Sequence, residues 1–207
     1  MDHDTFWQIV DDARTRAGRG ADDRGAEDDP LPDALTAVLV ERLSPDEILA
    51  FAAVSDEVST AAYAWPVWGA AYLIEGGCSD DGFMDFRDGL VLAGRDVFTR
   101  TVADPDSLAE HPVVVAMASD QGWFGFESLD SLVGDAWTKA TGRDDEDYYE
   151  ARDTAAPSAP AATGTGTGTD GSETPVGAST DPAGERWDFD DEDENRRRLP
   201  RLAALFA

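Results

Sequence analysis

Apolar residues recur every three or four positions through residues 4–142, which is typical of amphipathic helices packed around a shared core. Thr5 and Gln8 have the spacing of a capping box, so we expect Thr5 to cap the first helix. Ser44 and Glu47 form a second capping box, with a proline between them at the first helical position. The pattern predicts an all-α fold, a compact multi-helix domain. Its helices are expected near residues 5–17, 32–43, 45–64, 66–75, 80–103 and 126–141.

Glycines mark the expected ends and breaks of these helices. Gly76 and Gly77 suit a left-handed cap after residues 66–75, and Gly94 can break residues 80–103 into a pair of helices. Residues 18–30 are acidic and rich in glycine, so they are predicted to form a loop. Residues 113–117 are β-branched enough for a strand, but their helical neighbours favour a helix.

The segment 66–75 is apolar on nearly every side, which predicts a central, buried helix with Trp68 fully buried. Trp65, Trp68 and Tyr72 share one face of this helix, with Tyr63 just before it. Such a cluster can form an aromatic ligand box, but its apolar neighbours favour core packing.

A short polar turn follows this helix. Ser79 is expected to cap the next helix, with Asp80 and Asp81 in its first turn, where the helix dipole favours acidic groups. The alternative hypothesis is a site made by Cys78 with these acids, either a nucleophile or a hard-cation site completed by Asp85. Neighbouring carboxylates oppose a lowered thiol pKa, so the structural interpretation is preferred.

Other catalytic or cofactor patterns are missing from the sequence. One cysteine and two histidines give no zinc spacing, and the Gly-Thr repeat at 164–169 has no strand before it. No Ser-His-Asp arrangement can be assembled. We therefore expect no metal and no cofactor.

The acidic balance changes the list of partners. The 207 residues carry 44 acidic and 16 basic side chains, for a net charge of −28. Such a surface repels nucleic-acid phosphates, so nucleic-acid binding is not expected. The charge can serve solubility in the host, docking to a basic protein, or mimicry of nucleic acid. No apolar run is long enough for a membrane span, and the single cysteine fits a cytoplasmic location.

Composition divides the chain into three parts. Residues 1–153 form the predicted helical domain, 154–184 a disordered linker of Gly, Thr, Pro and Ala, and 185–207 a tail that docks on the domain. Asp190 or Asp191 can cap a helix in this tail. The tail has too many apolar groups to remain in water. The docking residues expected are Trp187, Phe189, Leu202 and Phe206.

Several strings resemble a known family. They are Asp4-Thr-Phe-Trp-Gln-Ile-Val-Asp11, Leu43-Ser-Pro-Asp-Glu-Ile-Leu-Ala-Phe51, Trp68-Gly-Ala-Ala-Tyr-Leu-Ile, Gly76-Gly-Cys-Ser-Asp-Asp-Gly-Phe83 and Trp187-Asp-Phe-Asp-Asp. Together they resemble the bacterial domain-of-unknown-function family 4240. The resemblance implies a helical cytoplasmic domain and carries over no activity, cofactor or catalytic residue. A tail shared with the family favours docking on its own domain.

The function expected from these observations is a non-enzymatic interaction or regulatory module with an unknown protein partner, for which a basic protein is one candidate. A small enzyme or ligand-binding protein is the first alternative, using the turn at Cys78, Asp80 and Asp81 together with Arg87. A second alternative is an inhibitor or immunity-type protein that binds a basic partner through the acidic surface.

Overall fold

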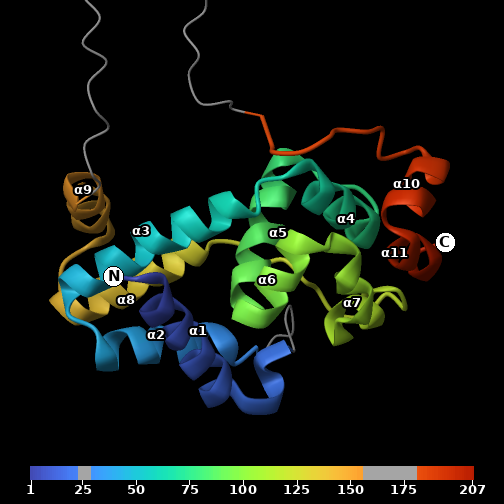
Figure 1. Cartoon of the computed structure of the whole chain (residues 1–207). Helices are drawn as coiled ribbons and strands as arrows, with labels where there is room; N and C mark the ends of the chain where they lie inside the picture. Colours follow the sequence, from blue (N-terminus) through green and yellow to red (C-terminus); the bar gives the residue numbers. More distant parts are fainter. Residues whose placement is uncertain (23–28, 156–180) are drawn as a thin grey trace, which may run out of the picture.

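The computed structural model describes residues 1–22, 29–155 and 181–207 (Figure 1). Within these ranges the chain is helical, with no named strand, so the all-α prediction is confirmed. The α-helices are α1 His3–Ala17, α2 Leu31–Arg42, α3 Pro45–Ala61, α4 Trp65–Glu75, α5 Asp80–Leu92, α6 Arg95–Ala103, α7 Pro112–Met117, α8 Leu129–Thr141, α9 Asp145–Ala155, α10 Glu192–Arg198 and α11 Pro200–Leu205. The 3₁₀ helices are η1 Gly18–Asp22 and η2 Pro105–Glu110.

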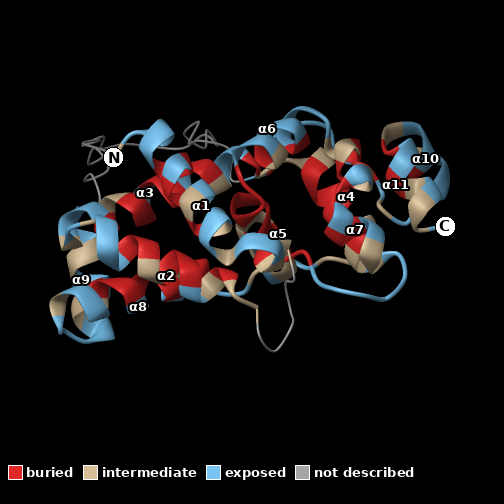
Figure 2. Ribbon diagram, turned by 90° about the horizontal axis from the view of Figure 1, so that it is seen from below, coloured by how far each residue is buried: buried red, intermediate tan, exposed pale blue. Residues whose placement is uncertain are grey.

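The helices form one elongated body around a continuous core. At one end α1, α2, α3 and α8 pack together with α9 beside them, and at the other end α4 contacts η2 and α11, with α7 packed on η2 and α10 on α11 (Figure 1). Between them, α5 contacts α1, α3, α4 and α6. Buried positions face one another between these helices (Figure 2). Phe6, Phe51 and Phe86 are completely buried in this core.

The structure confirms the helix N-caps predicted at Ser44 and Ser79, but not the one predicted at Thr5. The Glu47 carboxylate accepts a hydrogen bond from the Ser44 backbone nitrogen at 2.8 Å, as the capping box predicts. The predicted cap at Thr5 is wrong, because α1 begins at His3 and the Asp2 carboxylate accepts from the Thr5 nitrogen at 2.7 Å. Asp2 sits where a capping acceptor reaches the free N–H groups of the first turn. Ser79 caps α5 as predicted and accepts from the Gly82 nitrogen at 3.1 Å.

The glycine signals also place the helix ends. Gly76 has a left-handed backbone (φ 67°) and ends α4, while Gly94 (φ 94°) separates α5 from α6. Residues 112–117 form α7, so the helix that their neighbours favoured is the one observed. The helix α9 was not predicted, because five of its eleven residues are acidic and few are apolar. Its one buried residue, Tyr148, packs against Gly134 of α8. A single buried position does not produce the repeating apolar pattern by which a helix is predicted.

The boundaries of the predicted linker differ from those observed. Residues 154 and 155 complete α9, and Asp181 to Gly184 are already placed against the chain. Ala183 donates its backbone N–H to the Tyr63 carbonyl at 2.9 Å, and Trp65 donates to the Ala183 carbonyl at 2.8 Å. Residues 156–180, the rest of the predicted linker, lie outside the described residues. Among the described helices, none has the length and apolarity needed to cross a membrane.

Candidate functional site

The strongest candidate surface is the face formed by α4 and η2, which the C-terminal segment (residues 181–207) covers (Figure 1). Pro66 sits in the first turn of α4, where its missing N–H costs nothing. One side of α4 enters the core. The buried residues on this side are Val67, Trp68, Ala70, Ala71 and Ile74, whereas Gly69 is buried under the C-terminal segment. Trp65, Tyr72 and Leu73 are half-buried on the other side. An apolar helix therefore has one face left for the C-terminal segment to cover.

The predicted aromatic cluster is a stack of rings packed on one another. Trp68 is 9 % exposed and donates its indole N–H to the Cys78 carbonyl at 3.0 Å. Its ring stacks on Trp65 at 5.3 Å and on Phe83 at 4.7 Å between centroids. Tyr63 continues the stack beyond Phe83 at 6.0 Å. Because the rings fill the space between them, this arrangement supports core packing over a ligand box.

Gly69 creates the notch in which the C-terminal segment sits. A Cβ atom at this position would lie 2.2 Å from the Trp187 ring and 3.2 Å from Phe189. Trp187 is consequently 8 % exposed, and Phe189 packs against Tyr72 at 5.4 Å between ring centroids. The Tyr72 hydroxyl donates to the Asp190 carboxylate at 2.8 Å, a contact that joins the rim of the notch to the segment.

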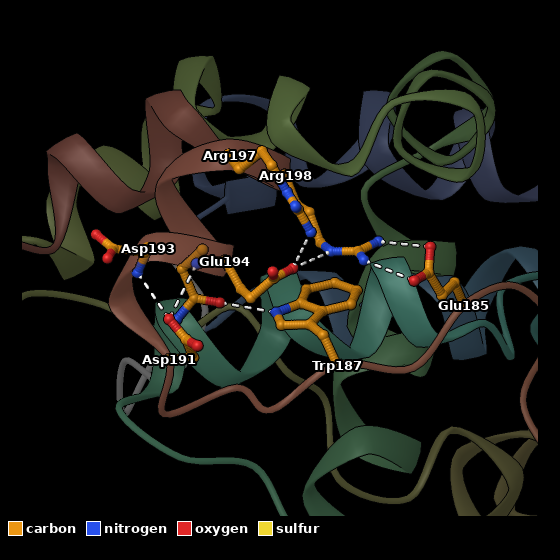
Figure 3. A network of polar contacts seen from close by, with 8 residues as sticks. Glu185, Trp187, Asp191, Asp193, Glu194, Arg197 and Arg198 are labelled. Carbon is orange, nitrogen blue, oxygen red and sulfur yellow. Dashed lines mark hydrogen bonds and ion pairs between the residues drawn. The ribbon is translucent and has the colours of Figure 1, made fainter.

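The segment holds its shape through its own polar contacts (Figure 3). Trp187 donates its indole N–H to the Asn195 side-chain oxygen at 2.9 Å, and the Asn195 amide donates to the Phe189 carbonyl at 2.7 Å. Arg198 lies over the Trp187 ring at 4.9 Å and binds Glu194 at 2.9 Å. Asp191 caps α10, which is one of the two caps the sequence predicted.

The second anchor is Asp106 of η2, which is 5 % exposed. Its carboxylate accepts from the backbone nitrogens of Arg201 at 3.0 Å and Leu202 at 2.9 Å, and from the Arg201 Nε at 3.0 Å. It thereby caps α11, whose own N-cap residue, Leu199, has no side-chain acceptor. Arg201 also pairs with Asp104 at 2.8 Å and Glu110 at 2.9 Å.

The expected docking residues occupy the interface to different degrees. Trp187 and Leu202 are buried, whereas Phe189 and Phe206 are half-buried and packed against the core. In this interface, the roles of Asp106 and Gly69 were not predicted from the sequence. Nothing near Asp106 in the sequence indicates a partner on a helix almost a hundred residues away.

The turn after α4 provides the N-cap and the acidic first turn of α5. Asp80 and Asp81 are exposed in the first turn of α5. Burial, and then the neighbouring Glu75 carboxylate, raise the pKa of the Cys78 thiol, so the thiol stays protonated at neutral pH. Burial also raises the pKa of Glu75 to about 7. Across the described residues no group of His, Cys, Asp and Glu side chains could hold a metal ion.

Arg87 shares the wall of one cavity with Asp80 of this turn, but its guanidinium packs on other residues. Its guanidinium lies over the rings of Tyr63 at 5.0 Å and Phe83 at 5.3 Å, and Nη1 donates to the Ser59 carbonyl at 3.2 Å. The structure thus brings Trp68, Asp80 and Arg87 to the wall of one cavity, while the predicted site residues as a whole face three directions. The aromatic residues face the core and the C-terminal segment, the Cys78–Asp81 turn starts α5, and Arg87 faces α3.

The comparisons with known proteins agree with the resemblance seen in the sequence. The sequence pattern of the family described as "Protein of unknown function (DUF4240)" matches residues 1–139. No curated protein and no solved structure matches the chain. The matched region contains α4, η2 and Arg87, whereas the Trp187-Asp-Phe-Asp-Asp string lies beyond it. Because the match covers more than half of the chain, the protein belongs to the DUF4240 family.

Proposed function

We propose that the protein is a non-enzymatic regulatory interaction module. The face of α4 and η2 is its receptor surface, and the C-terminal segment is the ligand that occupies this surface until a partner protein replaces it. The single observation that carries the proposal is the double anchor of the segment. Trp187 fills the notch at Gly69, and the buried Asp106 binds Arg201 and caps α11.

The segment has little stability away from this surface. Its helices α10 and α11 contain seven and six residues, which is too short for a helix to persist alone in water. Its exposed ion pairs, such as Arg196 with Glu192 and Asp193, contribute little in high dielectric. Order in the segment therefore depends on docking, and a competing ligand can displace it as a unit.

The receptor surface indicates the chemistry of the partner. It offers an apolar notch rimmed by Trp65 and Tyr72, together with the carboxylates of Asp104, Asp106 and Glu110. A displacing segment should combine an aromatic side chain with an arginine, as Trp187 and Arg201 do. The net charge of −28 would steer a basic protein toward this surface.

An exchange experiment tests the proposal. A fluorescent peptide of residues 181–207 is titrated into the full-length protein and its anisotropy is measured. Arg201→Glu weakens the resident segment, so the variant should bind the peptide at least about tenfold more tightly than the wild type. The matched control is Arg196→Glu, whose partners lie only within α10, and it should behave as the wild type does.

The same variants connect exchange to a partner. A photo-crosslinking residue at Tyr72 in Arg201→Glu should capture one protein in the host cell, and the 181–207 peptide should compete for that capture. If neither the wild type nor Arg201→Glu binds the peptide, the segment is a fixed part of the fold and the proposal fails. Capture that the peptide does not reduce would place the partner on another surface.

A further inference from the structure

A polar cleft lies outside the surface just described, where α3, α5, α8 and α9 meet. Its main cavity has a volume of about 440 Å³, and a second cavity of about 230 Å³ continues it toward Trp68. Thr60, Met84 and Arg87 line both cavities. The combined space is in the range of small-molecule sites. In the main cavity Arg87 is the one polar group that was singled out from the sequence, and the second cavity adds Tyr63 and Asp80.

Arg87 is the unusual member of this cleft. Within the described residues it is the one partly buried arginine with no carboxylate oxygen within 4.0 Å, whereas Arg14, Arg152 and Arg198 each have one. Its Nε and Nη1 donate to the carbonyls of Phe83 at 3.4 Å and Ser59 at 3.2 Å. Nη2 donates to no described residue. A guanidinium stays charged even where burial lowers its pKa, so this one has unused capacity for an anion.

The other walls of the cleft carry carboxylates. Arg152 binds Asp56 at 2.6 Å and also pairs with Asp130, which leaves this cluster with a net negative charge. Asp88, next to Arg87 on α5, is half-buried in the same cavity. Burial raises the pKa of Asp88 to about 7, against the opposing effects of Arg87 and of a hydrogen bond from the Leu129 backbone. A simple anion near Arg87 would therefore also meet repulsion from Asp88 and Asp56.

The charges on the cleft walls match a ligand that carries both signs. We propose that this cleft binds a small zwitterion of the α-amino-acid class, whose carboxylate pairs with Arg87 and whose ammonium group lies against Asp88. The ligand's side chain extends along the apolar part of the wall, formed by Ala52, Leu129 and Val133. Met84 stands at the junction of the two cavities and is 56 % exposed, so its flexible thioether can fold over a bound ligand.

Calorimetric titration of the full-length protein tests this site. The probes are the free proteinogenic α-amino acids, with acetate and methylamine as single-charge controls, each up to about 10 mM. At least one amino acid should bind saturably, and neither acetate nor methylamine should. Arg87→Gln should weaken that binding by at least about tenfold. Arg100→Gln, which changes an exposed arginine on α6, should not alter it.

Two further variants keep the test decisive. Arg87→Lys preserves the charge but loses the planar fork, so its affinity should fall between those of the wild type and Arg87→Gln. Asp88→Asn should weaken amino-acid binding and allow acetate to bind, because the repelling carboxylate is gone. Arg201→Glu should bind the amino acid as the wild type does, so this test is independent of the exchange experiment. The proposal is overturned if no amino acid binds, if acetate binds the wild type equally well, or if a folded Arg87→Gln protein keeps full affinity.

Discussion

Two arginines, Arg201 and Arg87, meet opposite surroundings in this molecule. Arg201 is 42 % exposed and faces three carboxylates, those of Asp104, Asp106 and Glu110. Arg87 is half-buried, and among the described residues it donates to two backbone carbonyls and lies over the rings of Tyr63 and Phe83. The face of α4 and η2 is thus filled by the chain itself, whereas Arg87 in the cleft forms no ion pair with the described residues. Under the two proposals, the first surface must be vacated before it can bind, whereas the second is open to a ligand.

The largest expected effect concerns the filled surface. Trp187→Ala should lower the free energy that holds the C-terminal segment in place by about 3–5 kcal/mol, because a large buried ring is removed above Gly69. Hydrogen exchange at the Leu202 amide, which donates to Asp106, measures this opening. Trp123→Ala is the control, since Trp123 is 40 % exposed and should change little. Unchanged protection of Leu202 in Trp187→Ala would mean that α11 docks without the notch.

Removing the second anchor, Asp106, should lower the docking free energy of the C-terminal segment by a smaller amount. Asp106→Asn removes charge-assisted hydrogen bonds to Arg201 and should cost about 1.5–3 kcal/mol in the same exchange measurement. Asp104→Asn, which removes an exposed ion-pair partner of Arg201, should cost less than about 1 kcal/mol. Combining Asp106→Asn with Arg201→Gln should cost less than the sum of the single changes, because both remove one interaction. Additive losses would show that the two side chains act separately.

The contribution of Asp88 to the stability of the fold should fall as the pH rises, which is the opposite of what an ion-paired carboxylate does. The pKa of Asp88 rises from 3.8 to about 7 on folding, so the protonated form fits the fold better. Ionising Asp88 therefore lowers stability as the pH rises from about 4 to about 7. After allowance for solvent screening, Asp88→Asn should be more stable than the wild type by about 1–2 kcal/mol at pH 8 and nearly equal near pH 4.

Denaturant unfolding of the wild type and Asp88→Asn at several pH values gives this difference directly. Glu75, whose pKa also rises to about 7, is unchanged in both proteins, so its contribution cancels. If the difference in unfolding free energy between the two proteins is the same at every pH, the pKa of Asp88 is not raised by folding.

The last and smallest expected effect is on the reactivity of the Cys78 thiol. Because its raised pKa keeps Cys78 protonated, the folded protein should react with iodoacetamide at pH 7 more than about tenfold slower than the same protein unfolded in urea. The rate is measured by mass spectrometry of the intact chain. Fast alkylation of the folded protein would restore the nucleophile hypothesis for the turn after α4.

The features that the sequence revealed are those decided by neighbours along the chain. The caps at Ser44 and Ser79, the end of α4 at Gly76 and the break at Gly94 follow from local backbone chemistry. Burial of Trp68 follows from the apolar composition of its helix. Each of these signals is contained within a few residues.

The missed features depend on distant segments. Asp106 caps α11, which begins more than ninety residues later in the chain. Gly69 matters only because Trp187 packs against it. The cleft combines Asp56, Arg87 and Arg152 from three helices that only the tertiary fold brings together. No periodicity or spacing rule connects such residues, so the sequence showed most of the helices, α9 excepted, but not the sites between them.

The ring stack gives the molecule an optical property of its own. Trp65 and Trp68 lie 5.3 Å apart with only 10° between their planes, close enough for the excited states of the two indoles to couple. Phe189 and Arg186 of the C-terminal segment lie against Trp65, whereas Phe83 lies against Trp68. Departure of the segment would leave one indole of the pair facing water and the other still enclosed. The near-ultraviolet circular dichroism and the emission wavelength of the unlabelled protein should therefore change when the C-terminal segment leaves the face of α4 and η2.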